Sequence, residues 1–370
     1  MQASEVLLMS SNIGKYISLQ IFGESHGKAI GAVIDGLPAG VELNFDKIAE
    51  QMARRAPGKD KTATPRKEDD IPEILSGIKG SVTTGAPLCA VIYNTNTRSS
   101  DYSEFEAMPR PSHADYPASV RFDGNNDLSG SGHFSGRLTA PMTFAGAVCR
   151  QILEKHGITV GGHVYSIGGV GDTGFDPVNV DAEQLNGLNK LAFPTVDKAA
   201  EKKMREKIEA ARMDGNSVGG TVEIAVVGLP AGCGDTMFGS IESRISEALF
   251  GVPAVKGIEF GAGFGFDKML GSEANDRYVN KDGKIATVSN NNGGILGGLS
   301  NGMPVIFRAV LKPTPSISKP QETLNLTTME AETLSIKGRH DPCVVVRGLA
   351  AIENLVCFVI CDILKGNGII

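Results

Sequence analysis

The stretch Gly-Lys-Ala-Ile-Gly-Ala-Val-Ile-Asp-Gly-Leu-Pro-Ala-Gly (27–40) has a counterpart in Gly-Gly-Thr-Val-Glu-Ile-Ala-Val-Val-Gly-Leu-Pro-Ala-Gly (219–232). Each is a run of apolar and β-branched residues closed by the same Gly-Leu-Pro-Ala-Gly turn, a pattern that predicts a buried strand. An amphipathic pattern follows each copy and predicts helices over Phe45–Arg55 and about Ser240–Leu249. The chain therefore shows the pattern of an internal duplication.

The similarity continues beyond these strands. Gly77-Ile78-x-Gly80 recurs as Gly294-Ile295-x-Gly297, and each copy leads into a predicted strand and later into a long apolar helix. We predict one α+β domain over 1–370, with pseudo-repeats near 13–165 and 215–365 whose sheets pack on shared central helices. The alternative is that glycine-rich turns resemble each other by chance. The predicted strands are Leu88–Tyr93 and Val305–Leu311, and the helices are about Pro141–His156 and Leu349–Leu364.

Composition limits the class of protein. The chain has 370 residues, a formal net charge of −6 and 46 glycines. Its six cysteines lack CxxC spacing, which predicts free thiols in a reducing compartment and a cytoplasmic location. No signal-peptide pattern opens the sequence, and its longest apolar run, Leu355–Leu364, is too short to span a bilayer. The arginines gather near glycine-rich motifs rather than over a broad basic surface, so we expect neither a membrane nor nucleic acid as a partner.

Four short glycine- or proline-rich motifs carry four of the six histidines. They are Gly-Glu-Ser-His-Gly (23–27), Arg-Pro-Ser-His-Ala-Asp (110–115), Gly-Ser-Gly-His-Phe-Ser-Gly-Arg (130–137) and Gly-Arg-His-Asp-Pro (338–342). Glycine lets the backbone approach a ligand closely, and a histidine held there exchanges protons near neutral pH. Any one motif is explained as well by a turn with a chance histidine, but four together predict an active site. The other two histidines, His156 and His163, are assigned to structure.

Basic side chains accompany these motifs. Arginine binds carboxylate or phosphate through two parallel hydrogen bonds, whereas the alternative for residues 54–67 is a solvated basic loop. Lys312-Pro-Thr-Pro-Ser, which follows a predicted strand, is a further candidate phosphate site. The basic residues are Arg54, Arg55, Lys59, Lys61, Arg66 and Lys67 in that loop, and Arg110, Arg137 and Arg339 in the motifs.

Other ligand motifs are absent from the sequence. There is no histidine or cysteine cluster with metal-ligand spacing and no nucleotide-binding P-loop. Gly261-x-Gly263-x-Gly265 lacks the strand-to-helix setting of a dinucleotide fingerprint, so we interpret it as a close-packed turn. The residues by themselves predict acid–base chemistry on a small, multiply anionic and phosphorylated molecule, and they identify no cofactor.

The motifs resemble the signatures of the chorismate synthase family, in family order and over nearly the whole chain. Gly-Glu-Ser-His-Gly with the following Asp-Gly-Leu-Pro resembles the first signature. Each further motif is a weak pattern alone, but the ordered set is specific. Gly132-x-x-Ser135-Gly136-Arg137-x-Thr139 resembles the second signature, and Arg339-His340-Asp341-Pro342-Cys343 with Glu353 resembles the third. Four further motifs fall in family order: Ile74-Leu-Ser-Gly, Pro111-Ser-His-Ala-Asp, Gly293-Gly-Ile-Leu-Gly-Gly and Lys312-Pro-Thr.

The resemblance implies a reaction and an architecture. The reaction is the trans 1,4-elimination of phosphate from 5-enolpyruvylshikimate 3-phosphate to give chorismate, the last step of the shikimate pathway, with reduced FMN and no net redox change. The implied fold is a β–α–β sandwich, a helical layer between two antiparallel sheets, assembled as a homotetramer. NADPH is the implied external reductant, with Arg55 and Lys61 as its contacts. The alternatives are an NAD(P)H-dependent flavin reductase and a non-catalytic phosphometabolite-binding protein.

The resemblance also assigns residues to roles. His26 would protonate or hydrogen-bond the departing phosphate, His113 would protonate or stabilise the reduced flavin, and Asp341 would remove the C6 proton together with flavin N5. The substrate-binding residues would be Ser25, Arg55, Arg66, Ser135, Arg137 and Arg339. The FMN contacts would be His133, Phe134, Ser135, Ala254, Gly297, Lys312, Pro313, Thr314, Pro315, Ser316 and Arg339, and no metal is implied.

The sequence departs from the family pattern at four positions. His133 stands for an arginine and Leu138 for a glutamate of the second signature in many bacterial members. Pro253 replaces an asparagine before Ala254, and Lys61 replaces an arginine. Because histidine titrates near neutral pH, we hypothesise that His133 is a flavin contact that titrates.

Overall fold

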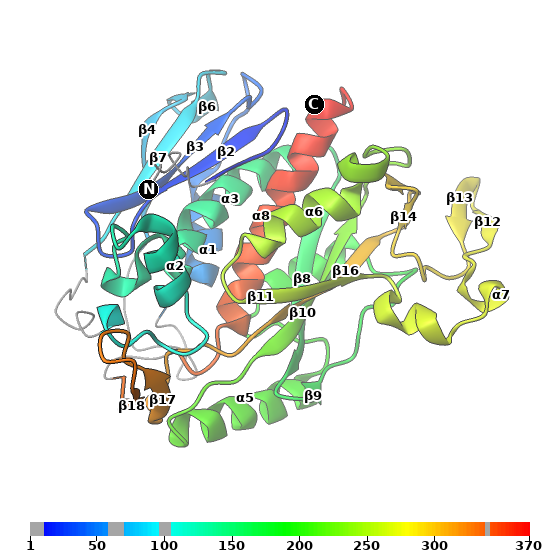
Figure 1. Ribbon diagram of the computed structural model, residues 1–370. Coiled ribbons are helices and arrows are strands. Elements are labelled where there is room, and N and C mark those ends of the chain that lie inside the picture. Colours follow the sequence, from blue (N-terminus) through cyan, green and yellow to red (C-terminus); the bar gives the residue numbers. More distant parts are fainter. Residues whose placement is uncertain (1–10, 58–69, 96–104, 337–340) are drawn as a thin grey trace.

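The computed structural model describes residues 11–57, 70–95, 105–336 and 341–370 (Figure 1). The described chain forms helices and two five-stranded antiparallel sheets, which confirms the predicted α+β class. The functional calls on Lys61, Arg66 and Arg339 lie outside the described residues, as do Lys59, Lys67 and His340.

The first sheet belongs to the N-terminal part of the chain and has the spatial order β1-β2-β3-β7-β4. Its strands are β1 (Asn12–Ile13), β2 (Ser18–Gly23), β3 (Ala29–Asp35), β4 (Glu73–Ser76) and β7 (Leu88–Tyr93). Alternate residues of β3, Ile30, Ala32 and Ile34, are fully buried, as expected for a strand with one face on the core. The turn between β2 and β3 is the Gly-Glu-Ser-His-Gly motif, so the hairpin fixes the place of His26.

The second sheet has the spatial order β11-β16-β10-β8-β9. Its strands are β8 (Thr159–Ile167), β9 (Val170–Gly171), β10 (Gly220–Val227), β11 (Val255–Phe260) and β16 (Val305–Leu311). β8 pairs with β10 along its length, so the predicted first repeat, 13–165, ends inside a strand of the second sheet. The two Gly-Leu-Pro-Ala-Gly strands reach their partners differently, because β3 follows β2 directly as a hairpin whereas residues 168–219 separate β8 from β10. The bounds of the pseudo-repeats stay a prediction.

Two long helices, α3 (Thr139–Lys155) and α8 (Val345–Gly366), pack on each other and contact strands of both sheets. All residues of α8 from Leu349 to Leu364 are buried. A helix that is buried all round belongs in the interior of the fold, and Figure 1 shows α8 between the two groups of strands. The central helices therefore form the common core against which both sheets fold.

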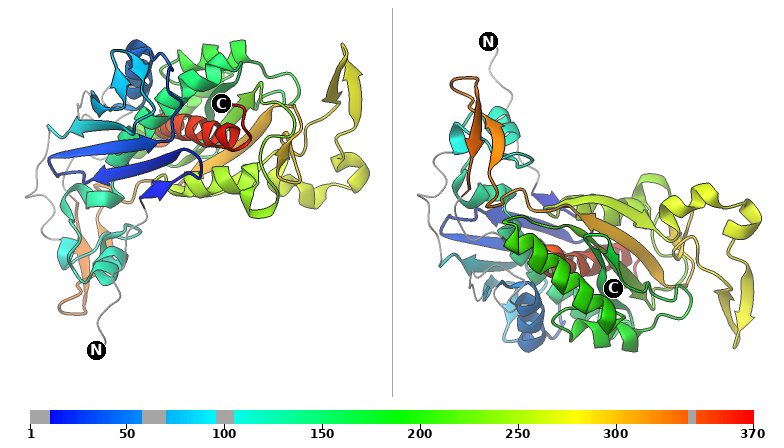
Figure 2. Two further views of the ribbon diagram at one scale, coloured as in Figure 1. Left: turned by 90° about the horizontal axis from the view of Figure 1, so that it is seen from above. Right: turned by 90° about the horizontal axis from the view of Figure 1, so that it is seen from below.

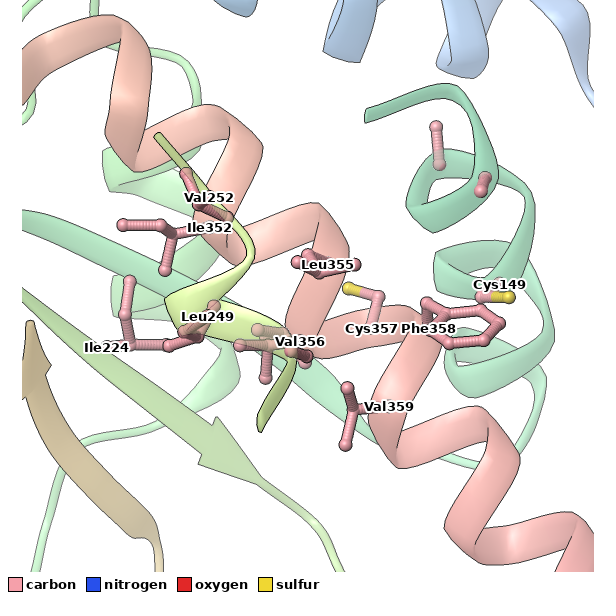
Figure 3. Close-up of a cluster of buried hydrophobic side chains, with 14 of the residues drawn as sticks. Cys149, Ile224, Leu249, Val252, Ile352, Leu355, Val356, Cys357, Phe358 and Val359 are labelled. Carbon is pink, nitrogen blue, oxygen red and sulfur yellow. The ribbon is translucent and has the colours of Figure 1, made fainter. Parts of the chain in front are cut away.

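The close-up of this core shows how α8 joins the layers (Figure 3). Val356 of α8 lies near Leu249 of α6 (Ile241–Phe250) and near Ile224 of β10, whereas Phe358 points toward Cys149 of α3. All five side chains are buried. Burying such side chains contributes about 1.5–3 kcal/mol each, so the interface of α8 with its neighbours is a main source of stability.

The helices occur where the sequence predicts them, with small differences at the ends. α1 (Phe45–Arg55) matches the prediction at both ends. α3 begins two residues before Pro141, because a proline in the first helical turn lacks only an N–H that has no intrahelical partner there. α8 begins at Val345, four residues before the predicted start.

The remaining elements are short, and one group projects from the body. Figures 1 and 2 show α7 (Gly271–Ala274) with β12 (Tyr278–Lys281) and β13 (Lys284–Thr287) extending away from the side that carries α2 (Asp115–Phe122). We call residues 261–290 the projecting arm. The other short elements are α4 (Ala182–Asn189), α5 (Lys198–Met213), β5 (Ile78–Lys79), β6 (Val82–Thr83), β14 (Ile295–Leu296), β15 (Leu299–Ser300), β17 (Gln321–Leu324) and β18 (Ala331–Leu334), with the 3-10 turns η2 (Ser129–Phe134), η3 (Gly136–Leu138), η4 (Met237–Gly239) and η5 (Gly263–Lys268).

The fold shows the surroundings of the glycine-rich turn and of the cysteines. Gly261 has a φ of +57°, and a Cβ there would lie 2.0 Å from the Asn291 carbonyl oxygen, which confirms a close-packed turn. All six cysteines are free thiols, and five of them are buried. Within the described ranges, no helix is long and apolar enough to cross a membrane. Nor do three or more metal-ligating side chains gather anywhere among those residues.

Candidate active site

The turn that carries His26 is held by hydrogen bonds from two directions. The Ser25 backbone N–H donates to the Gly132 carbonyl at 3.1 Å. From the end of β7, the Asn94 side-chain amide donates to the carbonyls of Glu24 at 3.0 Å and Gly27 at 2.8 Å. Ser25 is fully buried in this turn. His26 is thereby fixed between the first sheet and the segment that begins η2.

Gly130 allows the motif at 130–137 to pack against the motif at 23–27. Its φ is +58°, and a Cβ there would lie 1.8 Å from His26 Nδ1 and 2.8 Å from Ser25 Oγ. Ser131 and Gly132 also have positive φ values, 73° and 49°. Glycine adopts this left-handed backbone at little cost, so residue 130 meets both a conformational and a spatial requirement.

His113 lies in a buried network with Asp115 and Arg110. Its Nδ1 is 2.7 Å from Asp115 Oδ1, and its Nε2 is 3.1 Å from Ser131 Oγ. Because a carboxylate only accepts, His113 Nδ1–H donates to Asp115, and Nε2 of the neutral ring accepts from the Ser131 hydroxyl. Burial lowers the pKa of His113 below its usual value and outweighs the hydrogen bond to Asp115, so the ring is neutral at neutral pH.

Arg110 supports this network rather than a ligand. Its Nε and one terminal nitrogen bind the two Asp115 oxygens at 2.7 Å each, and its guanidinium also lies 3.2 Å from Ser131 Oγ and Ser316 Oγ and 3.1 Å from His113 Nδ1. Burial opposes ionisation of Asp115, but the hydrogen bonds from Arg110 and His113 outweigh it and hold the Asp115 pKa below its usual range. Arg110 was predicted to bind an anionic ligand, whereas its guanidinium pairs with the buried carboxylate of Asp115.

The Lys312–Ser316 segment follows β16 and runs beside His113. Lys312 Nζ donates to the Ser112 carbonyl at 2.6 Å, and the Lys312 backbone N–H donates to the Ala254 carbonyl at 2.9 Å. Burial, and secondarily the charge of Lys256, lowers the Lys312 pKa. Five predicted FMN contacts, Lys312 to Ser316, and Ala254 are thus placed together on the His113 side of the site.

Asp341 is joined to the same segment and to α8. Thr314 Oγ1 donates to the Asp341 carbonyl at 2.8 Å, and the Cys343 N–H donates to Asp341 Oδ1 at 3.3 Å. Arg347, in the first turn of α8, forms an ion pair with the Asp341 carboxylate. Arg347 was not predicted from the sequence, although a charged residue at the start of an otherwise apolar helix was an available signal.

Arg55 and Arg137 share one carboxylate, that of Asp70. Arg55 also donates to Thr139 Oγ1 and to the Gly136 carbonyl, both at 3.0 Å, and Arg137 Nε donates to Asn94 Oδ1 at 3.1 Å. Burial lowers the pKa of Arg55 to about 10, with the charges of Arg347 and Arg137 acting in the same direction, so the guanidinium remains protonated at neutral pH. Neither Asp70 nor Asn94 was singled out from the sequence.

These contacts join residues from distant parts of the chain into one set, which we call the site ring. From the His26 turn it passes through Asn94, Arg137 and Asp70 to Arg55, and the charge of Arg347 lowers the Arg55 pKa. From Arg347 it returns through Asp341, the Lys312 segment and His113 to the glycine-rich turn beside His26. The site ring thus consists of His26, Asn94, Arg137, Asp70, Arg55, Arg347, Asp341, Thr314, Lys312, Ser112, His113, Ser131 and Gly130.

His133 and its neighbours lie at the edge of the site ring. His133 Nδ1–H donates to the Gly23 carbonyl at 2.8 Å, and its Nε2 lies 2.8 Å from Ser11 Oγ, so both ring nitrogens already bind protein groups. Ser135 Oγ accepts the Arg137 backbone N–H at 3.3 Å and caps η3. A pocket of about 180 Å³ adjoins this segment, lined by Glu24, Phe122, Asn125, Asn126, Asp127, His133 and Phe134.

Gly297 is the predicted FMN contact that the fold does not bring to the site ring. It lies in the turn between β14 and β15, with a φ of +61°. This hairpin adjoins the start of β16, through hydrogen bonds such as that from Ile306 N to Gly293 O, whereas Lys312 follows the end of β16. The length of β16 therefore separates Gly297 from the predicted FMN contacts of the Lys312–Ser316 segment.

The two histidines assigned to structure have structural surroundings. His163 of β8 is fully buried between Asp172 and Glu223, with both distances 2.9 Å. The hydrogen bonds to these two carboxylates overcome the effect of burial and raise the His163 pKa. His156 is the C-terminal cap of α3, where its N–H donates to the Leu153 carbonyl.

Comparison with known proteins bears directly on this geometry. The family model for chorismate synthase matches residues 17–364, which include every described member of the site ring. The chain belongs to the chorismate synthase family. It is similar to a chorismate synthase of Dehalococcoides mccartyi, with 44% identity over 98% of both chains, and to one of Thermococcus kodakarensis, with 45% identity over 94% of this chain and 96% of the relative.

A solved structure of a chorismate synthase has the same fold. It matches 96% of this chain and 93% of its own with a TM-score of 0.75 at 25% sequence identity. The fold, the full-length match and the curated relatives therefore agree on the family that the sequence motifs predicted.

Proposed function

We propose that the site ring is the place where this protein carries out the chorismate synthase reaction. As a member of the family the protein is a carbon–oxygen lyase acting on phosphates, in the shikimate pathway of aromatic amino acid biosynthesis. The observation that carries the assignment to the site ring is the convergence of His26, His113 and Asp341. These residues are far apart in the sequence, yet hydrogen bonds and close packing link them through few intermediates.

In the proposed mechanism the substrate is 5-enolpyruvylshikimate 3-phosphate, and His26 assists the departing phosphate. The His26 turn is clamped by Asn94 and packed against Gly130, so the imidazole is pre-positioned before the substrate binds. A positioned acid typically contributes about 10²–10⁴-fold to the rate. Ser25, buried in the same turn, orients the phosphate together with Ser135.

Arg55 and Arg137 bind anionic groups of the substrate. Their side chains are almost fully buried, where a charge-assisted hydrogen bond is stronger than in water. Thr139, Gly136 and Asn94 hold the two guanidinium groups in place. Arg66 and Arg339 complete the proposed set. The resemblance implies that Arg55 contacts NADPH together with Lys61. The burial of Arg55 against Asp70 supports a contact with the substrate instead.

Asp341 receives the proton from C6. Its carboxylate accepts from Arg347 and from the Cys343 backbone N–H, so its orientation is fixed relative to Thr314 and the Lys312 segment. Since the elimination removes phosphate from C3 and hydrogen from C6, an acid at His26 and a base at Asp341 must act on the same bound molecule. Their placement in one site ring supports this division.

The residues present fit reduced FMN. Lys312 supplies a cation, Thr314 and Ser316 supply hydroxyl groups, and the neutral His113 Nε2 lies beside them. The chemistry that reduced FMN would supply there is transient donation of electron density to the substrate. The protein residues would hold and orient it. The proposed FMN contacts are His133, Phe134, Ser135, Ala254, Gly297, Lys312, Pro313, Thr314, Pro315, Ser316 and Arg339, with NADPH as an external reductant.

The finer architecture is also proposed. Reading the second sheet as β9-β8-β10-β16-β11 matches its spatial order to β1-β2-β3-β7-β4, with a helix after β3 and after β10 and a small hairpin before β7 and before β16. The two sheets differ at one edge, because β9 follows β8 in the chain whereas β1 precedes β2. This correspondence supports an internal pseudo-twofold duplication of a β–α–β sandwich. We also propose a cytoplasmic location, because the six free thiols suit a reducing compartment.

A homotetramer is the proposed assembly. The projecting arm and η4 expose large apolar side chains, among them Phe238 at 93%, Phe264 at 85% and Ile285 at 78%. Clusters of exposed apolar side chains usually mark an interface. Light scattering after size exclusion tests the assembly, with a mass of about four chains expected and a monomer as the result against it.

The elimination is tested by an anaerobic assay with dithionite-reduced FMN and 5-enolpyruvylshikimate 3-phosphate. Chorismate absorbance and released phosphate are followed together. The proposal expects the two products in equal amounts without net oxidation of the flavin. Flavin binding with neither product would contradict catalysis at this site and favour a phosphometabolite-binding role instead.

A further inference from the structure

Asp70 is a fully buried carboxylate that the proposed mechanism does not use. One of its oxygens pairs with Arg55 and the other with Arg137. Its backbone is in the left-handed region, with a φ of +49°. A carboxylate that bridges two guanidinium groups has the arrangement in which an anionic ligand would bind the same two arginines.

The two arginines are placed by other groups as well. Arg55 is held by Thr139 Oγ1 and the Gly136 carbonyl, and Arg137 is held by Asn94 Oδ1. These acceptors are neutral and belong to η3, to the start of α3 and to the end of β7, not to the segment that carries Asp70. What Asp70 adds to this arrangement is its negative charge.

We propose that Asp70 is an internal substitute for an anionic group of the substrate and is exchanged for that group when the substrate binds. The inference rests on the proposed function, in which Arg55 and Arg137 bind phosphate or carboxylate. With the Arg347–Asp341 pair, the described cluster holds three guanidinium groups and two carboxylates. Withdrawal of Asp70 raises the net positive charge that faces a multiply anionic substrate.

The exchange has a consequence for turnover. While the substrate is absent, Asp70 neutralises two buried cations that would otherwise carry a large desolvation cost. Once phosphate has left the substrate, the returning carboxylate competes with the product anions for the same arginines. Asp70 is thus a residue that sets the affinity of the site for anions and favours product release.

The test compares anion binding by wild type and by Asp70→Asn. FMN is present so that it occupies its proposed site at the Lys312 segment and the added anions do not bind there. Isothermal titration with inorganic phosphate, and separately with malonate, distinguishes exchange for a phosphate from exchange for a carboxylate. Because one negative charge is removed from between two cations, we expect at least one of the two anions to bind roughly tenfold more tightly. Unchanged or weaker binding of both anions overturns the proposal and makes Asp70 a positioning residue.

Glu353→Gln is the matched control. Glu353 is likewise fully buried and is near two arginines, Arg54 at 2.5 Å and Arg150 at 3.7 Å, but it is not part of the site ring. Removing its charge should leave the affinity for both anions unchanged. A similar gain in affinity in this variant would mean that any lost buried carboxylate has the effect, and it would overturn the proposal.

A measurement on wild type covers the case in which Asp70→Asn does not fold. Hydrogen exchange of a peptide spanning 70–76 is followed with and without inorganic phosphate. Release of Asp70 from its arginines predicts faster exchange in this peptide when the anion binds, whereas unchanged or slower exchange contradicts the exchange model. These experiments measure anion binding and need no turnover, so they are independent of the assay for chorismate formation. If the protein forms chorismate but the binding tests fail, the role of Asp70 is refuted and the proposed function stands.

Discussion

His113 and His163 are both buried and both lie beside carboxylates, yet their surroundings leave them in opposite protonation states. His113 has one carboxylate, Asp115, which Arg110 already neutralises, and its other nitrogen faces the Ser131 hydroxyl. His163 has a carboxylate on each nitrogen. Burial by itself lowers the pKa of both histidines. The single carboxylate beside His113 does not overcome this effect, whereas the two carboxylates beside His163 do and raise its pKa.

The partner of the second ring nitrogen therefore distinguishes a reactive histidine from a structural one. His163 donates both N–H groups to carboxylates, so it is a closed imidazolium bridge within the second sheet. His113 remains neutral and accepts at Nε2 from a hydroxyl that can be replaced by a ligand group. The first arrangement stabilises a fold, and the second provides an exchangeable proton site.

The largest effect is expected from His113→Ala. If His113 acts on the bound flavin, kcat for chorismate formation should fall by about 10²–10⁴-fold, because a positioned acid–base group is lost. Thermal unfolding should remain close to that of wild type. The matched control is His163→Ala, whose folded fraction should retain kcat. Equal losses of kcat in the two variants would abolish the distinction drawn between the two histidines.

The next effect is on stability, where the larger loss is expected from His163→Ala rather than from His113→Ala. His163→Ala leaves Asp172 and Glu223 buried without their shared cation, and breaking a buried pair in this way costs about 3–5 kcal/mol. Urea denaturation should show a loss of this size in the free energy of unfolding. His113→Ala serves as the comparison and should lose less, since Arg110 continues to neutralise Asp115. A His163→Ala variant as stable as wild type would refute the bridge.

Ser131→Ala sharpens the account of His113. The change removes the hydroxyl that lies 3.1 Å from His113 Nε2 but leaves the Asp115 contact intact. Loss of one such hydrogen bond is worth about 1 kcal/mol, so a modest several-fold change in kcat is expected rather than a collapse. Steady-state kinetics of Ser131→Ala beside His113→Ala tests this. A loss as large as that of His113→Ala would show that the hydroxyl itself reacts.

The smallest effect is the pH dependence of stability, which should have opposite signs at the two sites. The folded His163 pKa is raised, so its contribution is complete below the unfolded value of about 6.5 and is lost as pH rises through the folded pKa. The folded His113 pKa is lowered, so its contribution is present above about 6.5 and is lost as pH falls.

Denaturation of wild type and of each alanine variant across this pH range measures both contributions. His163→Ala should remove the loss of stability at higher pH, and His113→Ala should remove the loss at lower pH. The same direction of change in both variants would contradict the assigned protonation states.

The elements of the fold were predictable where the sequence is strongly periodic. β7, β16 and α1 occur at the predicted residues, because alternation and amphipathic spacing are local signals. The place of β8 was not predictable in this way, since its pairing with β10 is a long-range choice between two sheets that local periodicity cannot express.

The candidate site was predictable only in part, for a related reason. The glycine-rich histidine motifs mark His26 and His113, and the structure places both in the site ring. Asp70 and Asn94 act through partners distant in the chain, and no local pattern distinguishes them from ordinary surface residues. Arg347 had a local signal, its charge at the start of an apolar helix, but its partner Asp341 lies outside that helix. Gly297 follows its motif but is separated from the site ring by β16.

The most direct test of the central claim is single-turnover kinetics of His26→Ala with reduced FMN under anaerobic conditions, with phosphate and chorismate quantified together. His156→Ala, at the end of α3, is the control and should match wild type. The account predicts that both products form more slowly in His26→Ala by about 10²–10⁴-fold and remain equal in amount. Formation of both at the wild-type rate would contradict the placement of the reaction in the site ring.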